Sequence, residues 1–279
     1  MTKDLAIAAF DRYEYEQLQY WVNSLQMSGF TGDIVLIIFN GSFETVQKLV
    51  NKGVQVVALG VDQAKQRYVH QSNMPVHTER FFHIYNYLSE HGYKYNRVIT
   101  TDVKDVIFQQ DPFKWLDKYQ DKPIVVGSEC MYYKDEPWGD LNLKQAFGDF
   151  FYQRFKNNII YNVGVILGNV FYVRDLCLQI FQMCLNRPIP IVDQAVFNFL
   201  LATRPYQDCV QFCQLSDALV CHLGTTSDPT KPEFLFSLTE KPPIFEDGLF
   251  KTHDGKIFVS AHQWDRTNYY SEIMEKYRG

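Results

Sequence analysis

The chain has 279 residues, 46% hydrophobic and 16% aromatic, which is enough to bury the core of one large domain or two closely packed ones. Its 27 basic and 32 acidic residues give a formal charge of -5 with no basic block, which argues against a nucleic-acid partner. The apolar run near the amino terminus has only six residues, too short for an ordinary signal peptide or a bilayer span. We therefore expect a folded protein without a membrane span.

The six cysteines lack the dense spacing of a secreted disulfide framework. Most stand among apolar residues, which predicts reduced, partly buried thiols. Cys209, Cys213 and the pair Cys221-His222 could form a zinc site, but the usual two-residue gap between paired ligands is absent, so buried thiols are the stronger hypothesis. Asn40-Gly41-Ser42 fits a glycosylation sequon by pattern alone. Nothing else indicates a secretory route, so we expect a cytoplasmic protein.

The first sixty residues alternate apolar strands with amphipathic helices. Three short, nearly continuous apolar runs predict strands covered on both faces of a parallel sheet, at 5–10, 33–39 and 54–59. The first helix is predicted to stop near Gly29, and the second to begin at the cap candidate Ser42 and to end by Gly53. This βαβαβ order is typical of the half-unit of a nucleotide-binding fold.

The pattern continues through the rest of the chain. Helices are predicted at 77–91, 170–185 and 192–200, and strands at 97–101, 123–128 and 161–169. Between them, aromatic residues crowd the stretch 132–152 without a clean period; they form either a surface for sugars or partners or an irregular second core. No linker divides the chain. We expect one α/β domain over residues 1–279 with a mainly parallel sheet.

Two acids follow the strand at 97–101. Asp102 and Asp105 are poor strand residues and should fall in the turn at its carboxyl end. In an open α/β sheet, ligands bind outside the carboxyl ends of the strands, so a hard cation held there would be available to a phosphate-bearing ligand. Asp is also common in turns for its own reasons, which leaves an ordinary turn as the alternative.

Over nearly its whole length the chain resembles a GT-A type nucleotide-sugar glycosyltransferase. Five features carry this resemblance: the βαβαβ opening, Asp102-x-x-Asp105 before Asp111-Pro112-Phe113, the Asn162-x-Gly164 strand, the helix start Asp193-Gln194, and the late run His262-Gln263-Trp264-Asp265-Arg266. The resemblance implies a Rossmann-like sheet flanked by helices. Residues to about 120 would form the nucleotide-binding half, and residues from about 121 to 279 the acceptor-binding half.

The resemblance also implies a cation site. In the family an Asp-x-Asp motif binds manganese or magnesium on the diphosphate of the donor, and a late histidine is often a further ligand. Asp105 and His262 are therefore expected to ligate the metal. Val103 stands where the family has its first aspartate, so the role of Asp102 is open: it would touch the metal, its water, or the ribose. Imidazole beside carboxylates is compatible with manganese.

Three further residues are expected around the reacting bond. Arg80 would reach the diphosphate or orient the motif acids through its forked donors, with an ordinary salt bridge as the alternative. Asp193 and Gln194 would lie beside the donor sugar and its anomeric carbon. A carboxylate there would deprotonate the acceptor in an inverting reaction or hold sugar hydroxyls in a retaining one.

The remaining candidates are expected at the two ends of the ligand. Asn162 and Gly164 would face the sugar or acceptor, although the same pair would suit a plain turn. Phe10 and Asp11 would contact the base and ribose at the end of the first strand, and Phe10 would equally suit the core.

The implied activity is metal-dependent transfer of a hexosyl or pentosyl group from a nucleoside diphosphate sugar, with UDP as the expected nucleotide, to a glycan or other hydroxyl acceptor. One alternative is a catalytically silent sugar- or partner-binding module of the same fold, because fold does not fix function. Another is a nucleotidyltransferase that makes sugar nucleotides. Such enzymes usually have a Gly-rich loop after the first strand, and the loop here, residues 11–15, contains no glycine.

Overall fold

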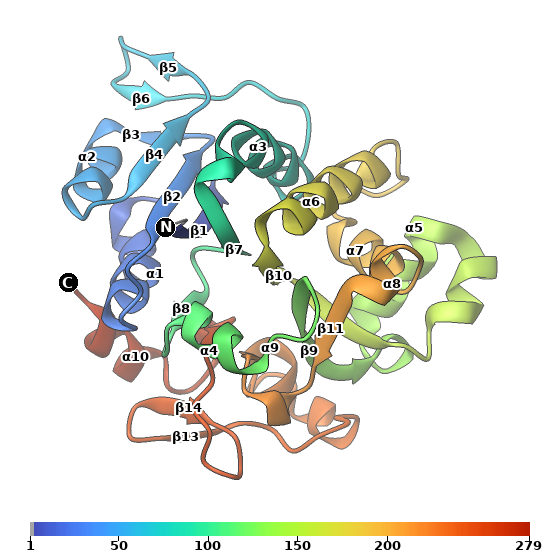
Figure 1. Cartoon of the computed structure of the whole chain (residues 1–279). Helices are drawn as coiled ribbons and strands as arrows, with labels where there is room; N and C mark the ends of the chain where they lie inside the picture. Colours follow the sequence, from blue (N-terminus) through green and yellow to red (C-terminus); the bar gives the residue numbers. More distant parts are fainter. Residues whose placement is uncertain (1–2) are drawn as a thin grey trace.

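The central element of the computed structural model, which describes residues 3–279, is a seven-stranded sheet in the order β11-β9-β10-β7-β1-β2-β4 (Figure 1). Its strands are β1 (Lys3–Phe10), β2 (Asp33–Ile38), β4 (Gln55–Ala58), β7 (Tyr95–Thr101), β9 (Ile124–Tyr132), β10 (Ile159–Asn169) and β11 (Val210–Cys213). Only β10 in this sheet runs antiparallel to its neighbours. The predicted mainly parallel α/β sheet is therefore confirmed.

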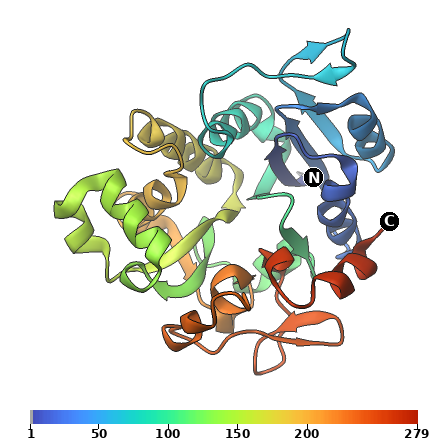
Figure 2. The ribbon, with the colours of Figure 1, turned by 180° about the vertical axis from the view of Figure 1, so that it is seen from behind.

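Helices cover both faces of the sheet (Figures 1 and 2). On one face lie α3 (Val76–His91), α6 (Val170–Cys184) and α7 (Asp193–Leu201); on the other lie α1 (Tyr15–Met27), α2 (Phe43–Asn51) and α4 (Pro112–Tyr119). Successive strand residues point to opposite faces, so Leu5 and Ile7 enter the first core while Ala6 and Ala8 enter the second. The apolar runs at 5–10 and 33–39 follow from this double coverage. The prediction of a strand covered on both faces at 54–59 is wrong, because β4 lies at the edge of the sheet and its residues are exposed or half-buried.

The predicted helix ends have the expected physical causes. Ser42 caps α2, because its side chain accepts a hydrogen bond from the Thr45 backbone N–H. Gly29 follows α1 with φ 85°, a left-handed conformation that glycine adopts without strain. The strand predicted at 97–101 is β7, directly before Asp102.

The carboxyl-terminal part of the chain contributes to two further, smaller sheets. It forms a three-stranded sheet from β12 (Val220–His222), β15 (Ser260–His262) and β8 (Val106–Phe108), and a hairpin of β13 (Ile244–Glu246) and β14 (Leu249–Lys251). The last helix, α10 (Tyr270–Tyr277), lies beside α1, where the Asn23 amide donates to the Tyr277 carbonyl at 2.9 Å. This hydrogen bond holds the carboxyl-terminal helix against α1, the helix of the first βα unit.

The aromatic stretch contains a helix, α5 (Pro137–Phe155), which the sequence did not predict. Gly148 interrupts it with non-helical angles (φ 76°, ψ 171°), so the apolar residues on its two sides do not share one helical face. Phe147, Phe151 and Phe155 surround Phe199 of α7, with ring centroids 4.8, 5.7 and 5.6 Å away. Phe147 and Phe155 pack against the first core and hold α7 in place, so the stretch does not form a separate second core, and Trp138 and Phe150 are exposed at the surface.

All six cysteines are free thiols, and within residues 3–279 none belongs to a group arranged to hold a metal ion. The thiol of Cys221 contacts the Ser260 carbonyl at 3.7 Å. The hypothesis of a zinc site at these cysteines therefore finds no support. None of the helices in the same residues combines the length and apolar character needed to cross a membrane.

Candidate active site

A polar cleft opens at the carboxyl ends of β1 and β7. It consists of two adjoining cavities of about 470 and about 630 Å³, which share Arg80, Asp102 and Asp105 in their walls. The smaller one reaches Asn162 and the start of α7, and the larger one reaches the end of β1. Nine of the ten predicted site residues border the cleft: Phe10, Asp11, Arg80, Asp102, Asp105, Asn162, Asp193, Gln194 and His262. The tenth, Gly164, lies directly against two of them.

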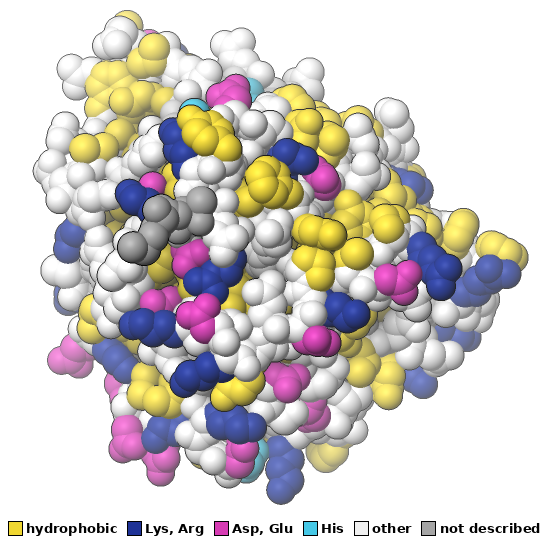
Figure 3. Space-filling model, viewed as in Figure 1, with side chains coloured by type: hydrophobic (Ala, Val, Ile, Leu, Met, Phe, Trp, Pro, Cys, Tyr) yellow, Lys and Arg dark blue, Asp and Glu magenta, His cyan; other side chains and the backbone are white. Residues whose placement is uncertain are grey.

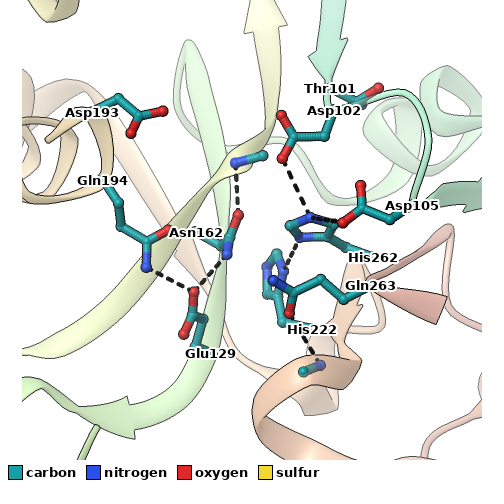
Figure 4. Close-up of polar contacts among 12 residues, drawn as sticks. Thr101, Asp102, Asp105, Glu129, Asn162, Asp193, Gln194, His222, His262 and Gln263 are labelled. Carbon is teal, nitrogen blue, oxygen red and sulfur yellow. Dashed lines mark hydrogen bonds and ion pairs between the residues drawn. The ribbon is translucent and has the colours of Figure 1, made fainter. Parts of the chain in front are cut away.

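The small sheet brings the late histidine to the motif acids. Asp105 precedes β8, which pairs antiparallel with β15 so that His262 stands opposite Val106. The Gln263 N–H also donates to the Asp105 carbonyl at 2.6 Å. As a result His262 Nε2 lies 3.4 Å from Asp102 Oδ2 and 3.5 Å from Asp105 Oδ2 (Figure 4). The late histidine thus meets two acids that precede it by more than 150 residues.

This trio fits the cation that the resemblance implies. His262 is 2% exposed, and its buried Nε2 has no hydrogen-bond partner although it faces two carboxylates. One ligand atom from each of the three residues lies within 4.8 Å of the others. Burial would raise the pKa of Asp105, but the neighbouring His262 holds it below its usual range, so the carboxylate form is favoured. Carboxylate oxygens and an imidazole nitrogen suit manganese and, less specifically, magnesium.

His222, which sequence reasoning missed as a site residue, fixes the orientation of His262. The two Nδ1 atoms are 3.0 Å apart, because β12 and β15 pair with His222 opposite His262. Burial lowers the pKa of His222 well below its usual value, which favours a neutral ring. A buried partner on the far nitrogen is the usual device for orienting a metal-binding histidine. The only sequence signal was the Cys221-His222 pair, which had suggested zinc.

Asp102 and His262 lie so close to position 164 that only glycine fits there without a shift. A Cβ at this position would lie 2.7 Å from both Asp102 Oδ2 and His262 Cε1, so no larger residue fits without a shift. The Gly164 carbonyl also accepts from the Asp102 N–H at 2.8 Å. The space that the sequence assigned to a ligand is thus taken by the proposed metal ligands themselves.

Arg80 links the two sides of the cleft. Its guanidinium donates to Asp102 and, at 3.2 Å, to Asp193 Oδ2, and the residue is 8% exposed. It also lies over the Phe81 ring, 4.8 Å from the centroid. Arg80 is therefore buried between two cleft acids, an arrangement compatible both with orienting Asp102 and with the salt-bridge alternative.

The side of the cleft opposite the trio is organised by Glu129 of β9, which sequence reasoning also missed (Figure 4). Its Oε1 accepts from Asn162 at 2.6 Å and from Gln194 at 3.0 Å. Burial raises the pKa of Glu129, which is 5% exposed. Because Gln194 uses its Nε2 here, its Oε1 is left for a ligand. The sequence signal that could have identified Glu129 is a single acidic residue within the mostly apolar strand β9.

The end of β1 forms the far wall. Asp11 is partly buried and accepts from the Asn40 amide at 2.6 Å. Phe10 borders the cleft, but its side chain is 1% exposed and belongs to the core beneath α1 and α2. Of the two interpretations of Phe10, its surroundings match the core residue.

The fold is similar to those of solved glycosyltransferases. The apo bifunctional glycosyltransferase WbbM matches with a TM-score of 0.58 and 13% identity, over 100% of this chain and 50% of that chain. The glycosyltransferase GlyE from Streptococcus pneumoniae matches with 0.54 and 15%, over 99% and 60%. An active-site mutant of LgtC matches with 0.54 and 13%, over 98% and 94%. The chain thus spans half to three fifths of the first two structures.

No family model matches the sequence, and no curated protein matches it significantly. At 13–15% identity the structural similarity establishes the fold. The chain has the GT-A type fold of glycosyltransferases, as the sequence resemblance implied.

Proposed function

We propose that this protein is a glycosyltransferase that moves a hexosyl or pentosyl group from a nucleoside diphosphate sugar, with UDP as the preferred nucleotide, to a hydroxyl of a glycan or other acceptor. The observation that carries the proposal is the convergence of Asp102, Asp105 and His262 in the cleft. Ligands of open α/β sheets bind at this position, and the fold is one that solved glycosyltransferases share.

The trio would hold manganese or magnesium, with Asp105 and His262 as ligands and Asp102 as a ligand or a partner of bound water. A divalent cation supplies Lewis-acid neutralisation of the charge that develops on a departing diphosphate. Arg80 adds a fixed positive charge and holds Asp102 in place. His222 and Gly164 keep the ligands oriented. The cleft is thereby arranged to receive an anionic leaving group.

The opposite side would receive the sugar and the acceptor. Asp193, anchored by Arg80, would hold a sugar hydroxyl or accept the proton of the acceptor, and the Gln194 amide oxygen would hold a neighbouring hydroxyl. Asn162 would complete this surface, while Asp11 would contact the ribose. The face shown in Figure 3 mixes basic and acidic side chains and presents no continuous basic surface of the kind that nucleic acids bind.

The test is release of UDP from a panel of UDP-sugars, with and without an acceptor mixture, at increasing manganese. We expect manganese-dependent turnover with at least one donor, since transferases usually hydrolyse their donor slowly. Asp105→Ala should weaken manganese-supported donor binding by at least about a hundredfold, more than outer-shell changes do. Asp121→Ala, which removes an exposed acid outside the cleft, is the matched control.

Two results would contradict the proposal. Tight nucleotide binding without turnover of any donor would identify a silent sugar- or partner-binding module. Unchanged manganese affinity in Asp105→Ala would remove the metal assignment.

A further inference from the structure

A second group of potential metal ligands lies in the amino-terminal half of α3 and in the segment before it, and the proposed transfer reaction does not use it. It consists of His70, in the connection from β6 (Arg67–Tyr68) to α3, with Glu79 and His83 on α3. One ligand atom from each lies within 4.8 Å of the other two. Figure 1 shows this connection crossing the top of the molecule from the small strands β5 (Val61–Asp62) and β6 to α3.

One distance within this group matches that between ligands of one ion, and the other is that of a hydrogen bond. Glu79 Oε1 lies 2.8 Å from His70 Nε2 and 3.5 Å from His83 Nε2. Ligand atoms about 2.0–2.1 Å from a tetrahedral zinc ion are roughly 3.4 Å from one another, so only small movements separate this arrangement from a bound state.

The rings are held in place before any ion arrives. Phe39 contacts both histidines edge-on, with centroids 5.3 Å away in each case. The two imidazoles are perpendicular to each other at the same separation. This apolar backing fixes the directions of the nitrogens, and the 19% exposed side chain of His70 leaves one edge open to solvent.

The group also leaves buried polar atoms without partners. Glu79 is 8% exposed, and its Oε2 has no hydrogen bond; the buried Nε2 of His83 has none of acceptable geometry. Unpartnered buried polar atoms are rare and costly, and a bound ion satisfies them. His262 in the cleft has the same feature.

We propose that His70, Glu79 and His83 form a second metal site that binds zinc. Two imidazoles and one carboxylate are ligands that zinc accepts, and water would fill the fourth tetrahedral position. Zinc would fasten residues 70–75 to α3. That segment ends at Pro75, which borders the cleft, and Glu79 precedes Arg80, so the ion would stiffen the wall that carries this arginine.

The test uses Asp105→Ala in the full chain, so that binding in the cleft is removed. After treatment with EDTA, the protein is titrated with Zn²⁺ against a chromophoric chelator, and with Co²⁺ while visible absorption is recorded. We expect one equivalent of bound zinc and the intense visible bands of tetrahedral cobalt. The parent protein should bind this equivalent as well, whether or not it transfers sugar.

Added to that background, His70→Gln and His83→Gln should each weaken zinc binding by at least about a hundredfold and remove the cobalt bands. His91→Gln is the matched control, because His91 lies on the same helix outside the group. Far-ultraviolet circular dichroism checks the fold of each variant. Two results would contradict the proposal: the Asp105→Ala protein binds no zinc, or both histidine variants still bind it. Either result would show that the three residues form hydrogen bonds with one another and no zinc site.

Discussion

The two sides of the cleft differ in how their buried polar groups are satisfied. On the motif side, His262 presents an unpartnered nitrogen to two carboxylates. On the opposite side, Glu129 is bonded to both Asn162 and Gln194. The motif side thus keeps a buried nitrogen without a partner, which the proposed cation would satisfy, whereas Glu129, Asn162 and Gln194 on the opposite side are already bonded to one another.

This difference predicts separate consequences for mutations on the two sides. Changes among the motif residues should act through metal-supported donor binding, because these residues would hold the proposed ion. Changes on the opposite side should act on turnover or on stability, because a preformed hydrogen-bond network is being altered. Arg80 contacts both sides, through Asp102 and Asp193, so its loss should affect both.

The largest effect on turnover is expected at Asp193. If this carboxylate accepts a proton or holds the reacting sugar, Asp193→Asn should lower kcat by about a hundredfold or more, with manganese affinity nearly unchanged. Steady-state kinetics with a turned-over donor, alongside manganese titration, measures both. Asp208→Asn is the control, since Asp208 is also an acid at a helix start but is exposed.

The buried ion pair with Arg80 allows a structural role for Asp193 as well. Breaking such a pair can destabilise a protein by about 3–5 kcal/mol, although Arg80 keeps Asp102 here. A variant that folds normally and turns over within about threefold of the parent, a barrier change below about 1 kcal/mol, would assign Asp193 to structure alone.

A smaller effect is expected from Gly164→Ala on the motif side. The added methyl group would meet Asp102 Oδ2 and His262 Cε1 at 2.7 Å, and His262 cannot easily yield because His222 fixes its ring. We expect manganese affinity to fall by about tenfold, a change typical of displaced ligand orientation. Isothermal titration with manganese measures it. Gly92→Ala, where the nearest side-chain atom is 3.5 Å away, should have no such effect, and equal affinities for the two variants would contradict the crowding argument.

Much of the fold could be predicted because local patterns carry it. Apolar runs specified the buried strands, and Ser42 and Gly29 marked helix ends through their own backbone chemistry. The helix α5 escaped prediction because Gly148 breaks its period, so no single face was apolar. The short strands β8, β12 and β15 are defined by long-range pairing, for which three residues offer no pattern.

Residues that a short motif or a family resemblance named, such as Asp105, Asp193 and His262, lie in the cleft, and their roles stay predictions. Glu129 and His222 were missed because each acts through a partner distant in sequence: Glu129 through Asn162 and Gln194, and His222 through His262. Neither contact leaves a spacing signal in the chain. Only the oddity of a carboxylate in the apolar strand Ile124–Tyr132 could have indicated Glu129.

The smallest effect is expected at Glu129 and concerns stability rather than binding. Burial raises the pKa of Glu129, so its stabilising contribution is full below the ordinary Glu pKa and is lost as pH rises through the raised value. Glutamine does not ionise, so Glu129→Gln should gain stability relative to the parent as pH rises above the ordinary Glu pKa and through the raised pKa of Glu129, as urea unfolding would measure. Glu90→Gln, at an exposed site on α3, should show no such trend. If the difference in unfolding free energy between parent and variant is constant with pH, Glu129 has the same pKa in the folded and unfolded states. The folded protein would then tolerate an ionised Glu129 in the cleft without any ligand.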